Sequence, residues 1–153
     1  MAACGDWAAR EPKVEEAARS GLAAAAAIAR VHKRALAMRA RLSKVAPPDA
    51  DALARRARAE WPEWSCPAFG EDTPQGRFQE SRWWEAPGRE LAWEERCLVT
   101  AGRASLWPEG GGPPIEIGAG DWVTFKRGFL CTWVVHEAIA KRYAYFGANG
   151  EQL

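Results

Sequence analysis

The chain divides into two parts by its pattern of apolar and polar positions. From Pro12 onward, apolar residues recur at steps of three and four among helix formers, which is the spacing of one stripe on an α-helix. The stripe consists of Ile28, Val31, Ala35, Met38, Leu42 and Val45. Pro47-Pro48 suits the end of a helix, and Asp49 is a candidate N-cap for another. The pattern predicts helices over residues 12–45 and 49–60.

From residue 61 the pattern changes to short runs rich in β-branched and aromatic residues, which is typical of strands. These runs lie at residues 97–100, 104–107, 115–117, 122–125, 130–135 and 141–146. Turn-forming residues separate them, including residues 101–102 and 136–138. Closely spaced turns without helical periodicity predict an antiparallel barrel or sandwich. We therefore expect an α-helical extension over residues 1–60 and a mainly β domain over residues 61–153.

Composition and charge exclude several classes of protein. The chain has 153 residues with nine Trp and only two His, so a metal site built from three histidines is excluded. The net charge of +1 combines +5 in residues 1–60 with −4 in residues 61–153. The four Cys form no Cys-x-x-Cys pair, which favours a reducing compartment. We expect a cytoplasmic protein, with organelle import as the alternative, and no membrane-spanning segment.

The first predicted helix carries a basic face. Its cations are Arg30, Lys33, Arg34, Arg39, Arg41 and Lys44, and no acidic residue lies between Ala17 and Pro48. Because no aromatic residue is interleaved with these cations, the face predicts a solvated surface and does not favour nucleic-acid or anionic-membrane binding. The apolar stripe is compatible with a helical hairpin that packs on itself or on the β domain, and with a coiled-coil partner.

The run from Gly118 to Trp133 is more specific than a generic strand pair. It reads Gly-Ala-Gly-Asp-Trp-Val-Thr-Phe-Lys-Arg-Gly-Phe-Leu-Cys-Thr-Trp, with Glu-x-Cys upstream and Lys-x-Tyr downstream. This arrangement resembles the (S)-ureidoglycine aminohydrolase-like cupin domain family over residues 83–146. Trp61-Pro-Glu-Trp-Ser-Cys66 extends the resemblance to the first strands of the barrel or its lid. The resemblance implies an antiparallel cupin-type, RmlC-like jelly-roll barrel.

The resemblance also implies a metal, because ureidoglycine aminohydrolases use a manganese site of several His with a Glu. Here Glu95 is kept, and Cys131 stands where the second cupin motif of metal-binding members has a histidine. One carboxylate and thiols are poor ligands for a hard divalent ion. The sequence therefore predicts no cofactor and no metal ligands, with manganese as the alternative that the resemblance implies.

Alternation along the predicted strands selects the candidate site, because every second residue shares a face. On three predicted strands, the face that carries polar and aromatic side chains is the one that the resemblance places at the barrel mouth. The candidate catalytic residues are Glu95, Lys141 and Tyr143, and the candidate ligand-binding residues are Cys97, Cys131, Trp133 and Trp93. The competing interpretation of each residue is structural. The carboxylate would lie at the rim and pair with arginine, the buried thiols would be inert, the Lys–Tyr face would point outward, and the aromatic side chains would pack in the core.

Two function hypotheses follow. In the first, the protein is a small cupin that binds a small polar carbonyl or carboxylate compound in the barrel mouth, with catalysis left open and a homodimer compatible with the fold. In the second, it is a non-catalytic cupin that acts as a ligand-binding or protein-interaction module through its basic N-terminal helices.

Overall fold

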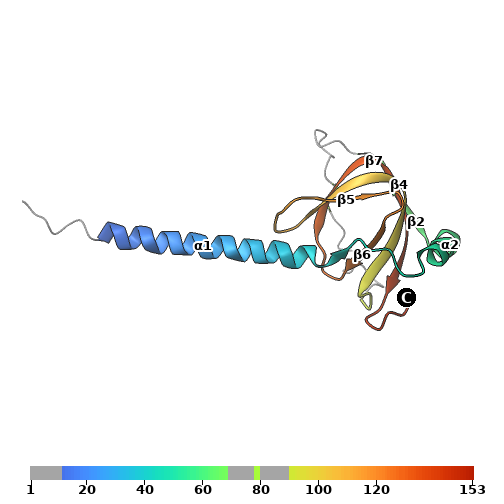
Figure 1. Ribbon diagram of the computed structural model, residues 1–153, viewed down its shortest axis with the longest axis horizontal. Helices are drawn as coiled ribbons and strands as arrows, with labels where there is room; N and C mark the ends of the chain where they lie inside the picture. The colour runs from blue at the N-terminus through green and yellow to red at the C-terminus, as the bar shows by residue number, and fades with distance from the viewer. Residues whose placement is uncertain (1–11, 69–77, 80–89) are drawn as a thin grey trace, which may run out of the picture.

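The computed structural model describes residues 12–68, 78–79 and 90–153 (Figure 1). A long helix leads into a strongly curved sheet. The helices are α1 (Pro12–Arg39) and α2 (Ala50–Glu60). The strands are β1 (Leu42–Ser43), β2 (Glu63–Cys66), β3 (Phe78–Gln79), β4 (Glu94–Pro108), β5 (Ile115–Gly118), β6 (Trp122–Lys126) and β7 (Cys131–Phe146).

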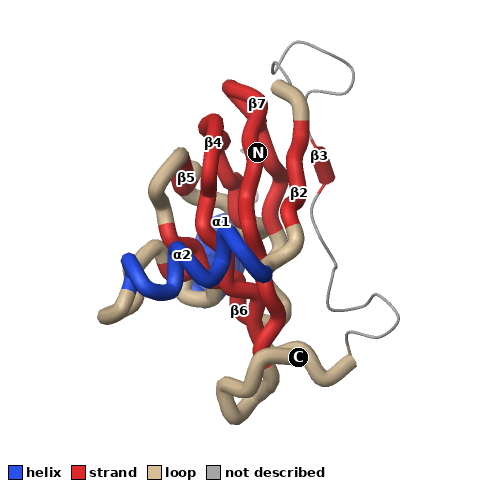
Figure 2. Tube along the Cα trace, turned by 90° about the vertical axis from the view of Figure 1, so that its right-hand side faces the viewer, coloured by secondary structure: helices blue, strands red, loops and turns tan. Residues whose placement is uncertain are grey.

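All seven strands belong to one antiparallel sheet. The order is β1-β6-β4-β7-β2, with β3 paired to β7 and β5 paired to β4. Figure 2 shows β4, β7 and β2 running side by side. The predicted mainly β, antiparallel class with helices at the N-terminal side is confirmed. Because β2 pairs with β7, the segment that begins at Trp61 contributes a strand to the barrel.

The two central strands are longer than predicted. The breaks expected at residues 101–102 and 136–138 do not occur, because β4 and β7 pair with each other along their length through a β-bulge. Gly102 lies in this bulge with a φ of +75°, and a Cβ there would lie 2.1 Å from the carbonyl oxygen of Ala138. Only glycine allows so close an approach of two backbones. The turn signal at Gly102 therefore marks a bulge rather than a chain reversal.

The bulge also changes which positions of β4 face the barrel interior. Before it the inward residues have odd numbers, namely Glu95, Cys97 and Val99. After it the inward residues are Ala104 and Leu106, which have even numbers. One inserted residue therefore exchanges the two faces of the strand, as the period of two requires.

Two apolar clusters cover the two faces of the sheet. The inner cluster lines the barrel interior and comprises Cys66, Cys97, Val99, Ala104, Leu106, Ile117, Val123, Phe125, Phe129, Cys131, Trp133, Val135 and Ile139. The outer cluster comprises Ala57, Trp61, Leu98, Trp122, Ala144 and Phe146, with Leu53 packed against it. The predicted apolar edge of the second helix thus lies on the sheet. Trp61 is 2% exposed, and its ring centroid lies 6.1 Å from those of Trp122 and Phe146.

Helix α1 ends at Arg39, six residues before the predicted end. Leu42 and Ser43 instead pair with β6, so the sheet begins before residue 60. The apolar stripe is divided accordingly: Met38 and Leu42 pack against the inner cluster, whereas Ile28 is 70% exposed.

The N-terminal part of α1 projects from the barrel, and α2 lies on its opposite side, so the two helices form no hairpin (Figure 1). Two cations of the predicted basic face contact the barrel: Arg39, the last residue of α1, donates to the carbonyl oxygen of Pro113, and Lys44, just after β1, has its Nζ 2.7 Å from Asp121 Oδ2. Neither described helix combines the length and hydropathy needed to cross a membrane.

Candidate functional site

A buried ion pair lies inside the barrel. Lys141 Nζ on β7 lies 2.5 Å from Glu95 Oε1 on β4, and the two side chains are 11% and 4% exposed. Lys141 is opposite Val99 in the strand register, and Glu95 is opposite Tyr145. The lysine side chain therefore runs along the interior, past the level of Cys97, to reach the carboxylate. Desolvating two charges is costly, so both groups depend on each other and on their surroundings.

Aromatic rings from three strands surround the ammonium group. Its Nζ lies 5.2 Å from the ring centroids of Trp64 on β2 and Phe125 on β6. On β7, the Trp133 centroid lies at 5.7 Å and the Tyr143 centroid at 5.5 Å. Ring faces attract a cation, and most strongly where water is excluded. Lys141 is therefore enclosed by one carboxylate and four rings.

This environment fixes the charge of the lysine. Burial by itself would lower the pKa of Lys141, but the Glu95 carboxylate raises it, with smaller contributions from Cys97 and Tyr143, and the pKa lies above its ordinary value. Lys141 is therefore an ammonium ion at neutral pH, which suits it to bind an anion or a carbonyl oxygen rather than to act as an amine nucleophile.

The neighbouring thiol of Cys97 is unreactive. Cys97 is fully buried, and this burial raises its pKa to about 12, the Lys141 ammonium lowering the value only in part. A nucleophilic cysteine needs a depressed pKa and an accessible sulfur. Cys97 therefore supplies packing and a weak S–H donor next to the ion pair.

Trp133 contributes a second hydrogen-bond donor. Its side chain is buried, and within the described residues its Nε1–H has no hydrogen-bond partner. Buried indole N–H groups normally find an acceptor, because an unpaired one retains its desolvation cost. Since the Trp133 ring also contacts Lys141, an ammonium and an unpaired indole N–H lie in the same apolar interior. Both groups recognise oxygen acceptors.

Six of the seven predicted site residues lie together on the inward face. Glu95 and Cys97 come from β4, and Cys131, Trp133, Lys141 and Tyr143 come from β7. The seventh, Trp93, precedes β4, is 51% exposed and lines a separate pocket. Sequence reasoning missed Trp64 and Phe125 as members of the site. The signals were present, since Trp64 belongs to the Trp-Pro-x-Trp segment and Phe125 to the Gly118–Trp133 block.

The barrel interior does not fit a divalent metal ion. Within the described residues there is no group of three or more His, Cys, Asp or Glu side chains placed to hold one. The carboxylate of Glu95 is already bound by the Lys141 ammonium, whose positive charge would repel a metal ion. The donor set and the local charge therefore disagree with the manganese site that the resemblance implies.

A polar cluster outside the barrel involves His136, which was predicted to lie in a turn. That prediction is wrong, since His136 lies within β7. Ser105 Oγ lies 2.5 Å from both His136 Nε2 and Glu116 Oε1. His136 Nε2 and Glu116 Oε2 are 4.0 Å apart, so the serine lies between the other two. In a nucleophilic triad the histidine holds that central place, and this order therefore does not activate the hydroxyl.

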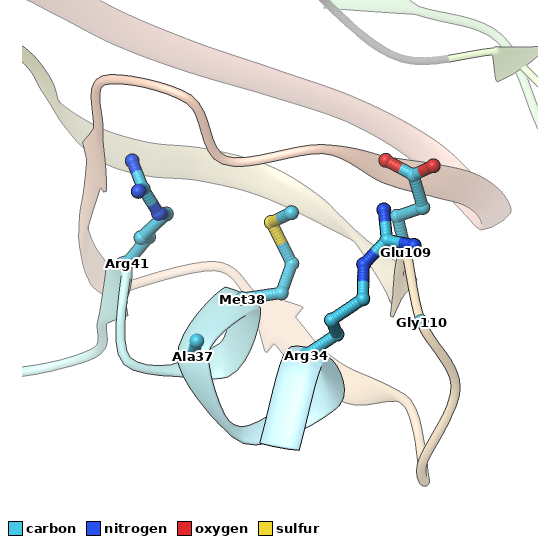
Figure 3. A pocket seen from close by; sticks show the side chains of 6 residues that line it. All are labelled: Arg34, Ala37, Met38, Arg41, Glu109 and Gly110. Atoms are coloured by element: carbon cyan, nitrogen blue, oxygen red, sulfur yellow. The ribbon is translucent and has the colours of Figure 1, made fainter. Parts of the chain in front are cut away.

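A small pocket of about 190 Å³ marks the junction between α1 and the barrel. Figure 3 shows Arg34 and Glu109 together at one side, Met38 in the middle and Arg41 at the other side. Met38 Sδ accepts a hydrogen bond from the backbone N–H of Leu130 at 3.1 Å. This contact fixes the end of the helix against the turn before β7.

Comparison with known proteins agrees with this architecture. Residues 72–143 match the family model of the EutQ-like cupin domain. A crystal structure of a DUF861 family protein from Thermotoga maritima is similar, with a TM-score of 0.50 and 24% identity, over 69% of this chain and 99% of that chain. No protein in the curated set is significantly similar. The fold is therefore that of the cupins.

Within the cupins, the sequence is similar to the EutQ-like type. The matched residues include β4 and most of β7, and therefore Glu95, Cys131, Trp133 and Lys141. The six inward candidate residues thus lie within the matched region, whereas Trp64 on β2 precedes it.

Proposed function

We propose that this cupin binds a small compound with a carboxylate or carbonyl group inside its barrel. The observation that carries the proposal is the pair of buried donors, the Lys141 ammonium and the Nε1–H of Trp133, which has no partner among the described residues. An oxygen acceptor of a ligand would satisfy both, and a carboxylate offers an oxygen to each. Nothing in this proposal requires a chemical step.

The surroundings support a compound that is partly apolar and partly polar. Trp64 and Phe125 provide flat apolar walls, and Glu95 provides an acceptor for a ligand N–H or O–H group. Tyr143, whose ring lies beside Lys141, carries a phenol that can donate or accept. Few polar groups in a mainly apolar interior are typical of small-molecule sites.

The Gly118–Trp133 block further supports membership of the ureidoglycine aminohydrolase-like group of small cupins. We do not extend the proposal to that hydrolysis, because the interior does not fit the metal ion on which it depends. The proposal is therefore a binding function, with Glu95, Lys141 and Tyr143 as ligand contacts.

A thermal-shift screen with small carboxylic acids, amides and ketones tests this proposal, followed by calorimetry on any compound that stabilises the protein. Trp133→Phe removes the unpaired N–H and keeps an aromatic ring, so it should weaken ligand binding by about tenfold. Trp61→Phe is the matched control, because Trp61 Nε1 is also buried without a hydrogen-bond partner among the described residues but lies in the outer cluster.

Equal loss of affinity in Trp133→Phe and Trp61→Phe would contradict the proposal, since it would indicate a general loosening of the fold. Stabilisation by amines alone would also contradict it, because cations should bind poorly beside an ammonium ion.

A second candidate function rests on the projecting part of α1. Leu22, Ile28 and Leu36 are 72%, 70% and 55% exposed. Exposed large apolar residues on one element mark interaction surfaces. We propose, as the alternative, a protein-interaction role for this helix. Sedimentation of the full chain and of a chain without residues 1–30 tests it: equal self-association and equal partner binding would refute this role.

A further inference from the structure

A second pocket lies outside the barrel, next to the C-terminal end of α1. It has a volume of about 370 Å³ and is lined by Ala40, Arg41, Trp93, Lys126 and Arg127. The lining residues come from three separate segments: the α1–β1 turn, the residue before β4, and the end of β6 with the first residue after it. None of them belongs to the Glu95–Lys141 centre. The volume lies within the range of small-molecule sites.

Backbone hydrogen bonds hold the three segments together. The N–H of Lys126 donates to the carbonyl oxygen of Arg41 at 2.8 Å, and the N–H of Arg127 donates to that of Trp93 at 2.7 Å. Gly128 has a φ of +80°, and a Cβ there would lie 2.6 Å from Arg41 Nη1. The absence of a side chain at Gly128 thus lets the guanidinium lie against the turn. The pocket is therefore built into the fold.

The pocket is lined by three cations and by no acidic residue. Arg41 donates to the carbonyl oxygen of Arg127, and Arg127 Nη1 donates to that of Glu90 at 2.9 Å. Within the parts of the chain that the structure describes, no salt bridge joins a carboxylate to Arg41, Lys126 or Arg127. Glu94 lies opposite Lys126 in the strand register, but its carboxylate pairs with Arg96. Three cations in a pocket without an acid favour an anionic ligand.

The remaining wall is aromatic. Trp93 is 51% exposed and lines the pocket, which is unusual exposure for the largest apolar side chain. An exposed indole next to guanidinium and ammonium groups is the combination that binds a planar base and its phosphate. Neither a simple anion nor a simple apolar compound would use both walls.

We infer that this pocket binds a nucleoside phosphate, with the base stacked on Trp93 and the phosphate held by Lys126, Arg127 and Arg41. The proposal assigns a ligand class to residues that the barrel site does not use. Its parts make separate predictions: the ring confers preference for a base, and the cations confer dependence on a phosphate and on salt.

Calorimetry with adenosine monophosphate, adenosine and inorganic phosphate as probes tests both parts. We expect the nucleotide to bind with a Kd below about 1 mM and more tightly than either fragment. Trp93→Ala should weaken its binding about tenfold, because stacking on an exposed ring is lost. Lys126→Gln should weaken it several-fold and reduce its dependence on salt. Both side chains are exposed, so both variants should keep the melting temperature of the parent.

Two control variants match these changes in residue type but lie outside the pocket. Trp107→Ala removes an indole that is 42% exposed on β4, and Lys33→Gln removes an exposed cation on α1. Neither should change the affinity for the nucleotide.

Three outcomes would overturn the proposal. The first is no heat of binding with adenosine monophosphate at millimolar concentration. The second is binding of inorganic phosphate as tight as that of the nucleotide, which would remove any role for Trp93. The third is tight binding of a single-stranded oligouridylate that Lys33→Gln weakens as much as Lys126→Gln, which would indicate an extended nucleic-acid surface along α1 instead.

Discussion

Replacement of Lys141 by methionine tests the buried ion pair most directly. The variant leaves the Glu95 carboxylate without its partner at a position where the side chain is 4% exposed. Breaking a buried pair by removing one partner costs about 3–5 kcal/mol. The distance of 2.5 Å and the exposed fractions place this pair in that class. We therefore expect Lys141→Met to lower the free energy of unfolding by about 3–5 kcal/mol.

A double variant distinguishes the contribution of the two charges to stability from the contribution of the packing around them. In the double variant with Glu95→Gln and Lys141→Met no charge is left inside the barrel. Uncharged replacements of a buried pair are often neutral or stabilising, so we expect recovery to within about 2 kcal/mol of the parent. Urea unfolding followed by tryptophan fluorescence measures all three proteins.

Arg103→Met is the control for this experiment, because it breaks an exposed pair. Arg103 Nε lies 3.4 Å from Glu137 Oε1, and the two side chains are 53% and 64% exposed. Such pairs contribute about 0–1 kcal/mol. A cost of Lys141→Met that is no larger than that of Arg103→Met would refute the reasoning. It would mean that water reaches the interior pair freely.

Three further predictions concern stability. Burial in the folded state raises the pKa of Cys97 from 9.0 to about 12. The contribution of the neutral thiol to the free energy of unfolding is therefore present below pH 9 and should be lost as the pH rises to about 12. Urea unfolding across this range should show a smaller loss in Cys97→Ala. The raised pKa of Lys141 acts in the same direction above its ordinary value of 10.5. Gly102→Ala should lower the melting temperature more than Gly111→Ala does, because both have positive φ but only Gly102 faces a backbone oxygen; equal shifts would show that the bulge is not strained by a Cβ. Removal of residues 1–30 should reduce the helical circular dichroism signal with little change in melting temperature, because every side chain from residue 19 to residue 34 is exposed; a large decrease would show that α1 supports the barrel.

Alternation within strands predicted which of the candidate residues face the barrel interior. The period of two placed Glu95 with Cys97 and Lys141 with Tyr143, and these pairs do face inward. A strand face is a local property, so it can be inferred from neighbouring residues alone. The block around Cys131 and Trp133 added the resemblance that indicated a cupin.

The remaining features depend on distant contacts. Gly102 carries the same local signal in a turn and in a β-bulge, and only the approach of Ala138 from β7 decides between them. Trp93 shares the parity of Glu95, yet it precedes the strand and is exposed. Arg41 belongs to the predicted helix by periodicity, but its carbonyl oxygen pairs with Lys126 and the helix ends before it. Pattern reasoning therefore placed this residue with the solvated helix face rather than in a pocket.

The pairing of β4 with β7 determines how the domain opens. These strands span 15 and 16 residues and run from Glu94 opposite Phe146 to Pro108 opposite Cys131. Neither strand can separate from the other without exposing both the barrel interior and the outer cluster. Their backbone amides should therefore exchange with deuterated solvent only through global unfolding, and last in the chain. Amides in the projecting part of α1 should exchange early, through local fraying that leaves this strand pair intact.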